Sequence, residues 1–337
     1  MARAGKPRLL PRSRGAARHE GRANRRADAR DRGADVAGEL GIGLRTDLDP
    51  GSYESIARRV ERAGIDVVSV FHDLLYQPAI GPLLLMARVT ERIRLGPASL
   101  NPFTLHPYEI AGQIAMLDTV SGGRAYLGLA KGAWLDRLAI EEERPLVALR
   151  EAVAIIRALL AGDDAGMDGE RFTLTPGTKL AYPTTRETVP LMIGTWGPKT
   201  ACWAGTVADE VKLGGSANPE LVPVVREWIG NPDVGLVFGC VTVVDEDGDW
   251  TRERARAVVG PYLEVVARLD PTLELQVGET PPFERFAIAG TPEEVANRVG
   301  ELWAAGAARV ELGTPQGRTP MTGIDLICDR VLPLLGR

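Results

Sequence analysis

Apolar runs and amphipathic segments alternate along the chain from residue 39 to its end. The apolar runs have few polar interruptions, and such continuity is typical of parallel strands that are buried on both faces. Segments with apolar residues at helical spacing lie between the runs, so we expect a repeated strand–helix unit. The runs predict eight strands, at residues 40–44, 65–71, 92–99, 126–130, 189–196, 210–215, 234–244 and 307–313.

Start and stop residues mark the ends of several expected helices. In the first helix, Ser52 can cap the first turn and Gly64 can end the last turn. Pro107 stands at the first turn of the helix that follows the third strand, where a missing N–H costs nothing. Thr291 and Glu294 have the spacing of a capping box and predict the start of the helix before the eighth strand.

The number and order of these elements predict a (β/α)8 TIM barrel, an α/β fold of parallel strands each followed by a helix. A doubly wound open sheet would produce the same alternation and stays an alternative at this point. Residues 163–188 are rich in turn formers, and we expect an inserted hairpin or lid over the barrel mouth before strand five. Residues 269–290 are interpreted as a second irregular excursion from the same domain.

Charge is distributed unevenly along the 337 residues. The first 32 residues hold ten arginines and one lysine against three acidic residues, a net charge of +8, and the remainder carries −13. An acidic body disfavours a nucleic-acid partner, whose phosphates require clustered lysine and arginine. Residues 1–37 contain no apolar run long enough for a signal peptide or membrane span. We interpret residues 1–37 as a disordered extension, or as translation from a start codon placed too far upstream, and residues 38–337 as a single domain.

Cysteine and histidine usage bears on the compartment and on metals. Cys202, Cys240 and Cys328 lie far apart in sequence and form no CxxC pair, and the chain has three histidines. This pattern suits reduced thiols in the cytoplasm and predicts neither a disulfide framework nor a metal site.

In barrels of this class, the active site is built from loops at the carboxyl ends of the strands. The residues at these ends include no paired carboxylates flanking a cleft, no nucleophile elbow, no P-loop and no metal-ligand spacing. Acid–base hydrolysis is therefore poorly supported. The candidates for chemistry at these ends are Arg45, His72, Asp73, Tyr76, Asn101, His106, Lys131, Gly132, Lys199 and Gly214.

Glycines stand beside cations at two successive strand ends. The turn "GTWGPKT" offers backbone N–H groups just before a helix N-terminus, with Lys199 close by in sequence. The turn "AKGA" adds Lys131 and Gly132 at the neighbouring strand end. A glycine after a strand often only makes a tight turn, but two such turns on adjacent strands favour a cofactor that carries a phosphate.

The order of these motifs resembles the bacterial luciferase-like superfamily of (β/α)8 enzymes, which bind FMN or the deazaflavin coenzyme F420. The resemblance is greatest to the branch of F420-dependent oxidoreductases that contains methylenetetrahydromethanopterin reductase. It covers about residues 38–335 and rests on three segments in order. These segments are "ERIRLGPASLNPFTLHPYEIAGQIAMLDTVSGGRAYLGLAKG", "PLMIGTWGPKTACWAGTVADEVKLGG" and "GTPEEVANRVGELWAAGAARVELG".

The resemblance implies positions for the cofactor. It places a non-proline cis peptide bond behind the ring, between Ala98 and Ser99 in "LGPASLNP", and Asn101 at the pyrimidine edge of the ring. The cofactor phosphate is implied to lie near Lys131 and Gly132 and near the strand ends that follow in the barrel. The residues implied there are Thr195, Trp196, Gly197, Pro198, Lys199 and Gly214.

Catalytic roles are expected from the loops after the second and fourth strands. His72, aided by Asp73, is the predicted proton donor for a hydride transfer between the cofactor and an organic substrate. Tyr76 and Trp134 are expected to line the substrate pocket. The sugar-phosphate dehydrogenases of the family carry a catalytic glutamate where this chain has Ala133, which puts their reaction in doubt here.

Three functions stay open at this stage. The first is an F420-dependent oxidoreductase acting on a small organic molecule, and the second is an FMN-dependent monooxygenase of the same superfamily. The third is a barrel without catalysis that serves as a binding partner. The resemblance further implies a homodimer, and the cysteine, charge and hydropathy patterns predict a cytoplasmic protein that binds neither nucleic acid nor membrane.

Overall fold

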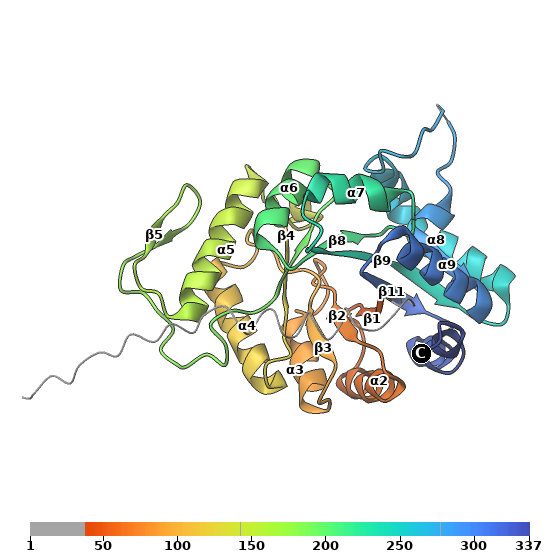
Figure 1. Cartoon of the computed structure of the whole chain (residues 1–337), viewed down its shortest axis with the longest axis horizontal. Helices are drawn as coiled ribbons and strands as arrows, with labels where there is room; N and C mark the ends of the chain where they lie inside the picture. Colours follow the sequence, from red (N-terminus) through yellow and green to blue (C-terminus); the bar gives the residue numbers. More distant parts are fainter. Residues whose placement is uncertain (1–37, 142, 277) are drawn as a thin grey trace, which may run out of the picture. The chain divides into compact units, whose positions relative to one another are not determined.

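A nearly closed barrel of eight parallel strands forms the centre of the computed structural model, which describes residues 38–337 except 142 and 277 (Figure 1). Around the barrel the strands are β3 (Arg94–Pro97), β2 (Val67–Val70), β1 (Glu39–Leu44), β11 (Arg309–Gln316), β9 (Gly235–Val244), β8 (Glu210–Gly214), β7 (Leu191–Gly194) and β4 (Leu127–Ala130). Single-residue parallel bridges from Leu95 to Ala125 and from Leu100 to Leu129 bring β3 beside β4. The (β/α)8 prediction is confirmed, and the doubly wound alternative is wrong.

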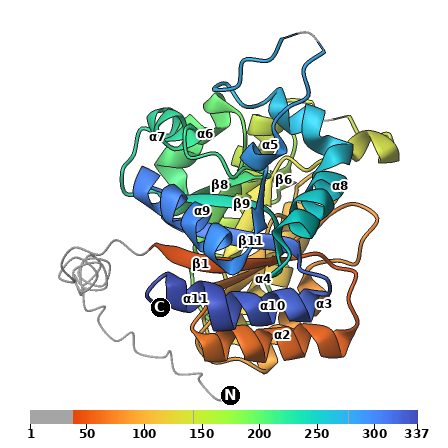
Figure 2. The ribbon, with the colours of Figure 1, turned by 90° about the vertical axis from the view of Figure 1, so that its right-hand side faces the viewer.

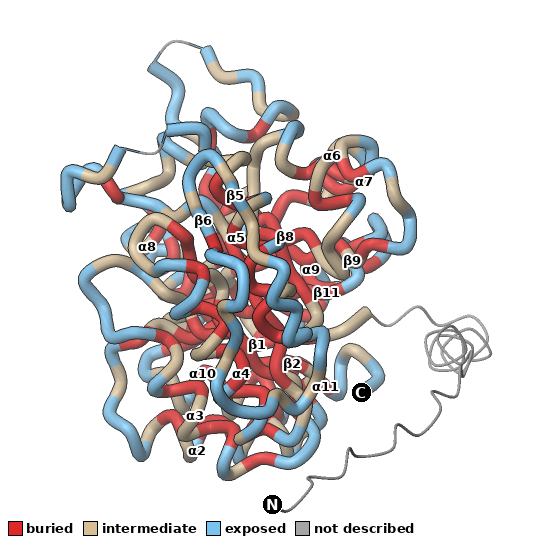
Figure 3. Tube along the Cα trace, turned by 90° about the vertical axis from the view of Figure 1, so that its left-hand side faces the viewer, coloured by how far each residue is buried: buried red, intermediate tan, exposed pale blue. Residues whose placement is uncertain are grey.

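Helices surround the strands and bury their apolar faces against them, as the red inner segments of Figure 3 show. They are α2 (Pro50–Ala63), α3 (Ile80–Arg88), α4 (Pro107–Ser121), α5 (Pro145–Ala161), α6 (Pro198–Val207), α7 (Leu221–Ile229), α8 (Gly248–Ala267), α9 (Pro292–Ala305), α10 (Pro320–Leu326), the π-helix η3 (Ile327–Val331) and α11 (Leu332–Leu334). The C-terminal helices lie along α2 in Figure 2, where Arg59 forms ion pairs with Asp325 and Asp329.

Most expected helix ends are confirmed. Pro107 occupies the first turn of α4, and Thr291 and Glu294 form a complete capping box on α9. The expected cap of the first helix is wrong, because α2 begins two residues earlier, at Pro50, and Asp49 caps it. The Asp49 carboxylate accepts the backbone N–H of Ser52 at 3.1 Å, so Ser52 is a donor within the first turn.

An inserted hairpin occupies the expected position before β7. Its strands are β5 (Met167–Asp168) and β6 (Thr173–Leu174), and Figure 1 shows it beside α5. The Phe172 ring packs edge-to-face on His106 at 5.4 Å, which joins the hairpin to the loop after β3. The role of this hairpin as a lid stays a prediction.

The second irregular region contains more regular structure than expected. The strand β10 (Ala287–Gly290) pairs in parallel with the carboxyl half of β9, and a 3-10 turn, η2 (Phe283–Arg285), precedes it. The helix α8 was also not predicted, because its many charged residues and internal Pro261 obscure its apolar face.

Residues 1–37, interpreted above as an extension, lie outside the described residues. Among the residues that the structure does describe, no helix is long and apolar enough to cross a membrane. The same residues contain no group of three His, Cys, Asp or Glu side chains arranged to hold a metal ion. Cys202, Cys240 and Cys328 are free thiols.

Candidate active site at the carboxyl end of the barrel

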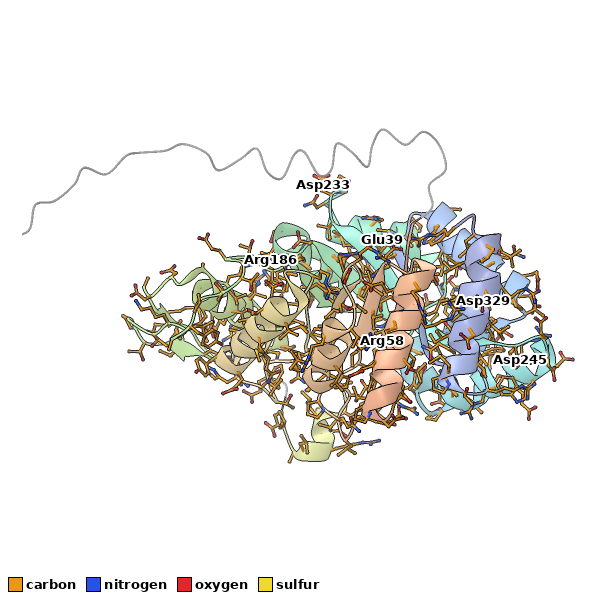
Figure 4. All side chains as sticks on the ribbon, turned by 90° about the horizontal axis from the view of Figure 1, so that it is seen from below. Glu39, Arg58, Arg186, Asp233, Asp245 and Asp329 are labelled. Carbon is orange, nitrogen blue, oxygen red and sulfur yellow. The ribbon has the colours of Figure 1, made fainter. Side chains whose placement is uncertain are left out.

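The two ends of the barrel are distinguished by residues that precede or follow its strands. Figure 4 shows Glu39 and Asp233, at the amino ends of β1 and β9, on the side opposite Asp245, which follows β9. A cavity of about 200 Å³ lies at the carboxyl end. Its lining comes from the loops after β2, β3 and β4 and consists of His72, Asp73, Leu74, Leu75, Tyr76, Pro78, Asn101, Thr104, Ala133, Trp134, Leu135 and Leu138.

His72 lies in the turn after β2, where its imidazole is half-buried. Its Nδ1 accepts the backbone N–H of Ala79 at 3.3 Å, so the neutral ring carries its proton on Nε2. Burial lowers the pKa of His72, which keeps the ring neutral near pH 7. The position and tautomer make Nε2 the atom that can donate or share a proton.

Asp73 follows His72 and lines the same cavity. Burial raises the pKa of its carboxyl group, while the positive charges of Arg45 and Lys212 oppose the shift. Within the described residues no hydrogen bond joins Asp73 to His72, and the His72 Nδ1 accepts from the backbone of Ala79. His72 and Asp73 are thus two adjacent titratable residues in the same cavity that are not hydrogen-bonded to each other.

Asn101 follows the cis peptide bond between Ala98 and Ser99, which is present as expected. Its side-chain oxygen accepts the backbone N–H groups of Phe103 and Thr104 at 3.0 and 2.9 Å, so it closes its own turn. Its amide nitrogen faces Gly132, where an added Cβ would approach to 3.2 Å. The turn therefore leaves the amide nitrogen of Asn101 as the group available to a ligand.

Tyr76 and Trp134 lie on two different loops of the same cavity, and their role in binding substrate stays a prediction. The guanidinium of Arg45 lies 5.2 Å from the Tyr76 ring centre, and that of Arg137 lies 5.5 Å from the Trp134 ring. Such cation–π contacts hold aromatic rings that would otherwise move freely at a surface.

The remaining expected cofactor residues form a second group at the ends of β7 and β8, outside the lining of this cavity. The indole N–H of Trp196 donates to the Gly214 carbonyl at 2.8 Å and joins the two strand ends. The Thr195 hydroxyl accepts the backbone N–H of Gly197 at 2.9 Å, and Gly197 is the N-cap of α6. Pro198 and Lys199 open α6, and both are exposed.

This second group fits an anionic phosphate. No side chain caps the N-terminus of α6, and its first residue, Pro198, has no N–H, so the backbone N–H groups of Lys199 and Thr200 are the ones that could meet an anion. An added Cβ at Gly214 would meet open space, which leaves room for a ligand beside that turn. Lys131 and Gly132 directly follow β4, the neighbour of β7, and Gly132 adopts a φ of +89° that a side chain would strain.

Sequence reasoning missed a buried polar network inside the barrel below the cavity. Lys212 of β8 and Glu311 of β11 form an ion pair, and both side chains are almost completely buried. Glu311 also accepts the Ser69 hydroxyl at 2.7 Å and pairs with Arg309 at 3.1 Å, and Ser69 contacts the Tyr126 hydroxyl at 2.6 Å. The signal in the sequence was a charged residue in each of two apolar strands.

Small residues and opposite charges make room for this network. Gly239 lies beside the Lys212 side chain, since an added Cβ would approach its Cε to 2.9 Å. Burial raises the pKa of Glu311, but Lys212 and Arg309 more than offset burial and hold the pKa below its usual value. The Lys212 ammonium lies 5.5 Å from the centre of the Phe71 ring, and Phe71 directly precedes His72 in the chain. The network therefore carries a fixed cation beneath the candidate site.

Comparisons with known proteins agree with the barrel fold. The sequence profile of the family described as luciferase-like monooxygenase matches residues 31–309. The 5,10-methylenetetrahydromethanopterin reductase of Archaeoglobus fulgidus is 30% identical over an alignment of length 340. The alignment covers 88% of this chain and 99% of that protein. The F420-dependent glucose-6-phosphate dehydrogenase of Mycolicibacterium smegmatis is 26% identical over 299 residues, which cover 78% of this chain and 88% of that protein. The coenzyme F420 dependent tetrahydromethanopterin reductase of Methanopyrus kandleri has a similar structure, with a TM-score of 0.77, 25% identity and coverage of 88% of this chain and 99% of the other.

Proposed function

Because this chain belongs to the luciferase-like monooxygenase family, we propose that it is an oxidoreductase that uses coenzyme F420 and a small organic substrate. The observation that carries the proposal is the meeting of His72, Asp73 and Asn101 in one cavity at the carboxyl end of the barrel. Similarity to an F420-dependent reductase over 88% of the chain supports F420 over FMN. When bound, the deazaflavin would supply hydride transfer, and the protein would supply orientation and a proton.

Two groups of residues would hold the cofactor. The uncapped N-terminus of α6 and the open turn at Gly214 would bind its phosphate, with Lys131 and Gly132 at the adjacent strand end. The amide nitrogen of Asn101 would donate to the polar edge of the ring.

His72 would hold the mobile proton on Nε2, since Ala79 occupies Nδ1. Replacing His72 by asparagine should lower kcat by about 10²- to 10⁴-fold, the usual contribution of a positioned acid or base. Asp73 would support His72 through the local charge, because its carboxyl group borders the same cavity. Cofactor affinity should stay unchanged in the His72 variant.

Titration of the purified protein with F420 and, separately, with FMN tests the cofactor. We expect saturable binding of F420, followed by the change in its absorbance and fluorescence, and little binding of FMN. Saturation by FMN alone would instead support an FMN-dependent monooxygenase. Binding of neither cofactor, together with stable association with another chain, would support the barrel as a non-catalytic binding partner.

A matched pair of variants tests where the cofactor phosphate lies. Gly214→Asp places a carboxylate at the turn between the strand ends, where a Cβ meets open space. It should weaken F420 binding at least about tenfold, equivalent to about 1.4 kcal/mol. Gly300→Asp, at an equally open position on α9, should leave affinity unchanged. Equal affinity in both variants would contradict this placement.

The outer face of α4 supports the proposal of a homodimer. Its Tyr108 and Met116 are 46% and 54% exposed, and Tyr182 is exposed beside it. Asp118 is turned inward, where it pairs with Arg186, which Figure 4 labels. Met116→Glu should convert a dimer to monomers in sedimentation, whereas Val265→Glu on α8 should not. The free thiols support a reducing compartment, for which the cytoplasm is our proposal.

A further inference from the structure

The cavity at the carboxyl end is mainly apolar. Among its described lining residues the only titratable side chains near neutral pH are His72 and Asp73, and none is a lysine or arginine. Its volume of about 200 Å³ is below the roughly 300–1,000 Å³ of sites for drug-sized ligands. Because Asn101 would hold the edge of the cofactor ring, the part of the cavity beside Tyr76 and Trp134 suits one compact ring system better than an extended or highly charged molecule.

Large apolar side chains surround this cavity and stay accessible to solvent. Leu75 is 74% exposed, Leu138 48%, Tyr76 45% and Trp134 42%. Side chains of this size are normally removed from water, at roughly 25 cal/mol per Å². Their gathering around one cavity, on the loops after β2 and β4, indicates a surface that a ligand covers.

The backbone holds two of these side chains in an uncommon conformation. Leu75 has a φ of +72° and Trp134 a φ of +59°, in the left-handed region that residues with a side chain rarely adopt. Such residues cost about 1–3 kcal/mol each and concentrate at ligand clamps and active sites. The loops therefore hold these positions against a conformational cost.

Both aromatic rings of the cavity are held by cations. The Arg45 guanidinium over Tyr76 is itself fixed by Asp47, whose carboxylate accepts the Arg45 Nε–H at 2.8 Å. The Arg137 guanidinium lies over Trp134. Each ring is thus a restrained flat surface that can stack on a planar ligand at a low entropy cost.

We propose that the substrate of this site is a compact, uncharged, planar conjugated molecule with a carbonyl-type oxygen, stacked on Tyr76 and Trp134. The oxygen lies toward His72, whose Nε2–H is a donor. A sugar phosphate fits poorly, because no lysine or arginine is among the described lining residues to pair with its phosphate. This inference rests on the proposed function, since it names the substrate of the same site.

Binding of model compounds tests the inference without the cofactor. The apoprotein is titrated near pH 7 with 2-acetonaphthone, with 2-naphthoate and with glucose 6-phosphate, followed by calorimetry. We expect the neutral ketone to bind at least about tenfold more tightly than the carboxylate of the same ring size. Equal or tighter binding of the carboxylate or of the sugar phosphate would overturn the inference.

Two variants locate the site of binding. Trp134→Leu should weaken ketone binding about tenfold or more, whereas Trp203→Leu should not. Trp203 is a matched control because a guanidinium, that of Arg150, also lies over its ring, at 5.9 Å, and it lies outside the cavity lining. Leu138→Lys adds a cation at an exposed rim position and should shift the preference toward the carboxylate. Unchanged ketone affinity in Trp134→Leu, or an unchanged preference in Leu138→Lys, would overturn the inference.

The separate F420 titration distinguishes the two proposals. If F420 binds and the ketone does not, the substrate inference is wrong and the proposed oxidoreductase stands. If the ketone binds and neither cofactor does, the apolar site exists but the proposed function is wrong.

Discussion

The two ends of the barrel both contain a cavity, but the polar groups around them are satisfied to different degrees. The larger cavity, about 420 Å³, lies at the amino end and is lined by charged residues that have partners. There Arg94 pairs with Glu39, and Asp66 pairs with Arg337 at 2.6 Å. The smaller cavity at the carboxyl end is mostly apolar, and exposed aromatic and aliphatic side chains surround it. The larger cavity therefore lies at the end of the barrel opposite the candidate site.

One carboxylate at each end illustrates the difference. Burial raises the pKa of Glu61 at the amino end, but the backbone N–H groups of residues 91–93 more than offset burial, and the pKa is lowered. Burial also raises the pKa of Asp73 at the carboxyl end, and the charges of Arg45 and Lys212 oppose it only in part. Backbone hydrogen bonds thus stabilise the charged form of Glu61, whereas burial outweighs the nearby positive charges at Asp73.

The largest expected effect comes from a buried cation among the satisfied charges of the amino end. Arg309→Met leaves the carboxylates of Glu210 and Glu311 without the guanidinium that now lies 2.7 and 3.1 Å from them. Loss of one partner of a buried ion pair costs about 3–5 kcal/mol. Urea unfolding should show this loss in the free energy of unfolding.

Arg94→Met is the matched control for this variant. Arg94 pairs with Glu39 and Glu210 at the rim of the barrel, where its side chain is 34% exposed. Exposed ion pairs contribute roughly 0–1 kcal/mol, so the loss should be small. Similar losses in the two variants would mean that burial does not set the contribution of these charges.

A second test compares one glycine at each end. Gly132 has a φ of +89° and an added Cβ would lie 3.1 Å from the Asn101 side chain, whereas Gly64 has a φ of +91° and open space around it. Gly64→Ala should cost about 1–2 kcal/mol through the left-handed backbone alone. Gly132→Ala should cost more, because Asn101 must also shift.

Cofactor binding separates the same two alanine variants. If Asn101 holds the ring, Gly132→Ala should lower F420 affinity and Gly64→Ala should not. Equal affinities for F420, measured by fluorescence titration, would contradict a role for the Asn101–Gly132 contact in binding.

The eight barrel strands were predictable from the sequence, whereas the strand β10 and the helix α8, which follow β9, were not. All eight apolar runs correspond to barrel strands, because strands buried on both faces need near-continuous apolar residues. The strand β10 was missed because "AIAG" is short and contains no β-branched pair, and α8 was missed because charged residues dominate it. Local pattern is weak where tertiary packing decides the structure.

The candidate site could be predicted in part for a similar reason. The carboxyl ends of parallel strands meet at one edge, so His72, Asn101 and Trp134 were expected together and line one cavity. The ion pair of Lys212 and Glu311 joins residues 99 positions apart, and it depends on the register of β8, β9 and β11. No local spacing signals such a pair.

A third test uses the strained backbone at the carboxyl end. Leu75→Gly removes a left-handed residue that is 74% exposed. Removing the side chain relieves the cost of the left-handed backbone, about 1–2 kcal/mol, and adds the entropy cost of glycine, about 0.5–1 kcal/mol. The free energy of unfolding should therefore rise by about 0.5–1 kcal/mol. Val265→Gly, at an exposed helical position of α8, should lower it by roughly 0.5 kcal/mol. A loss in both variants would show that Leu75 contributes to stability as an ordinary surface residue does.

The smallest expected effect is the pH dependence that His72 adds to stability. Burial lowers its pKa in the folded state from the usual value near 6.5, so the unfolded chain binds more protons in the window just below that pH. Its contribution is fully present above about pH 6.5 and is lost as pH falls through the lowered pKa. Wild type should therefore lose more unfolding free energy than His72→Gln between about pH 7 and 5, by at most about 1.4 kcal/mol per pH unit. If urea unfolding shows the same change of unfolding free energy with pH in both proteins, burial does not disfavour the protonated form of His72 in the folded state.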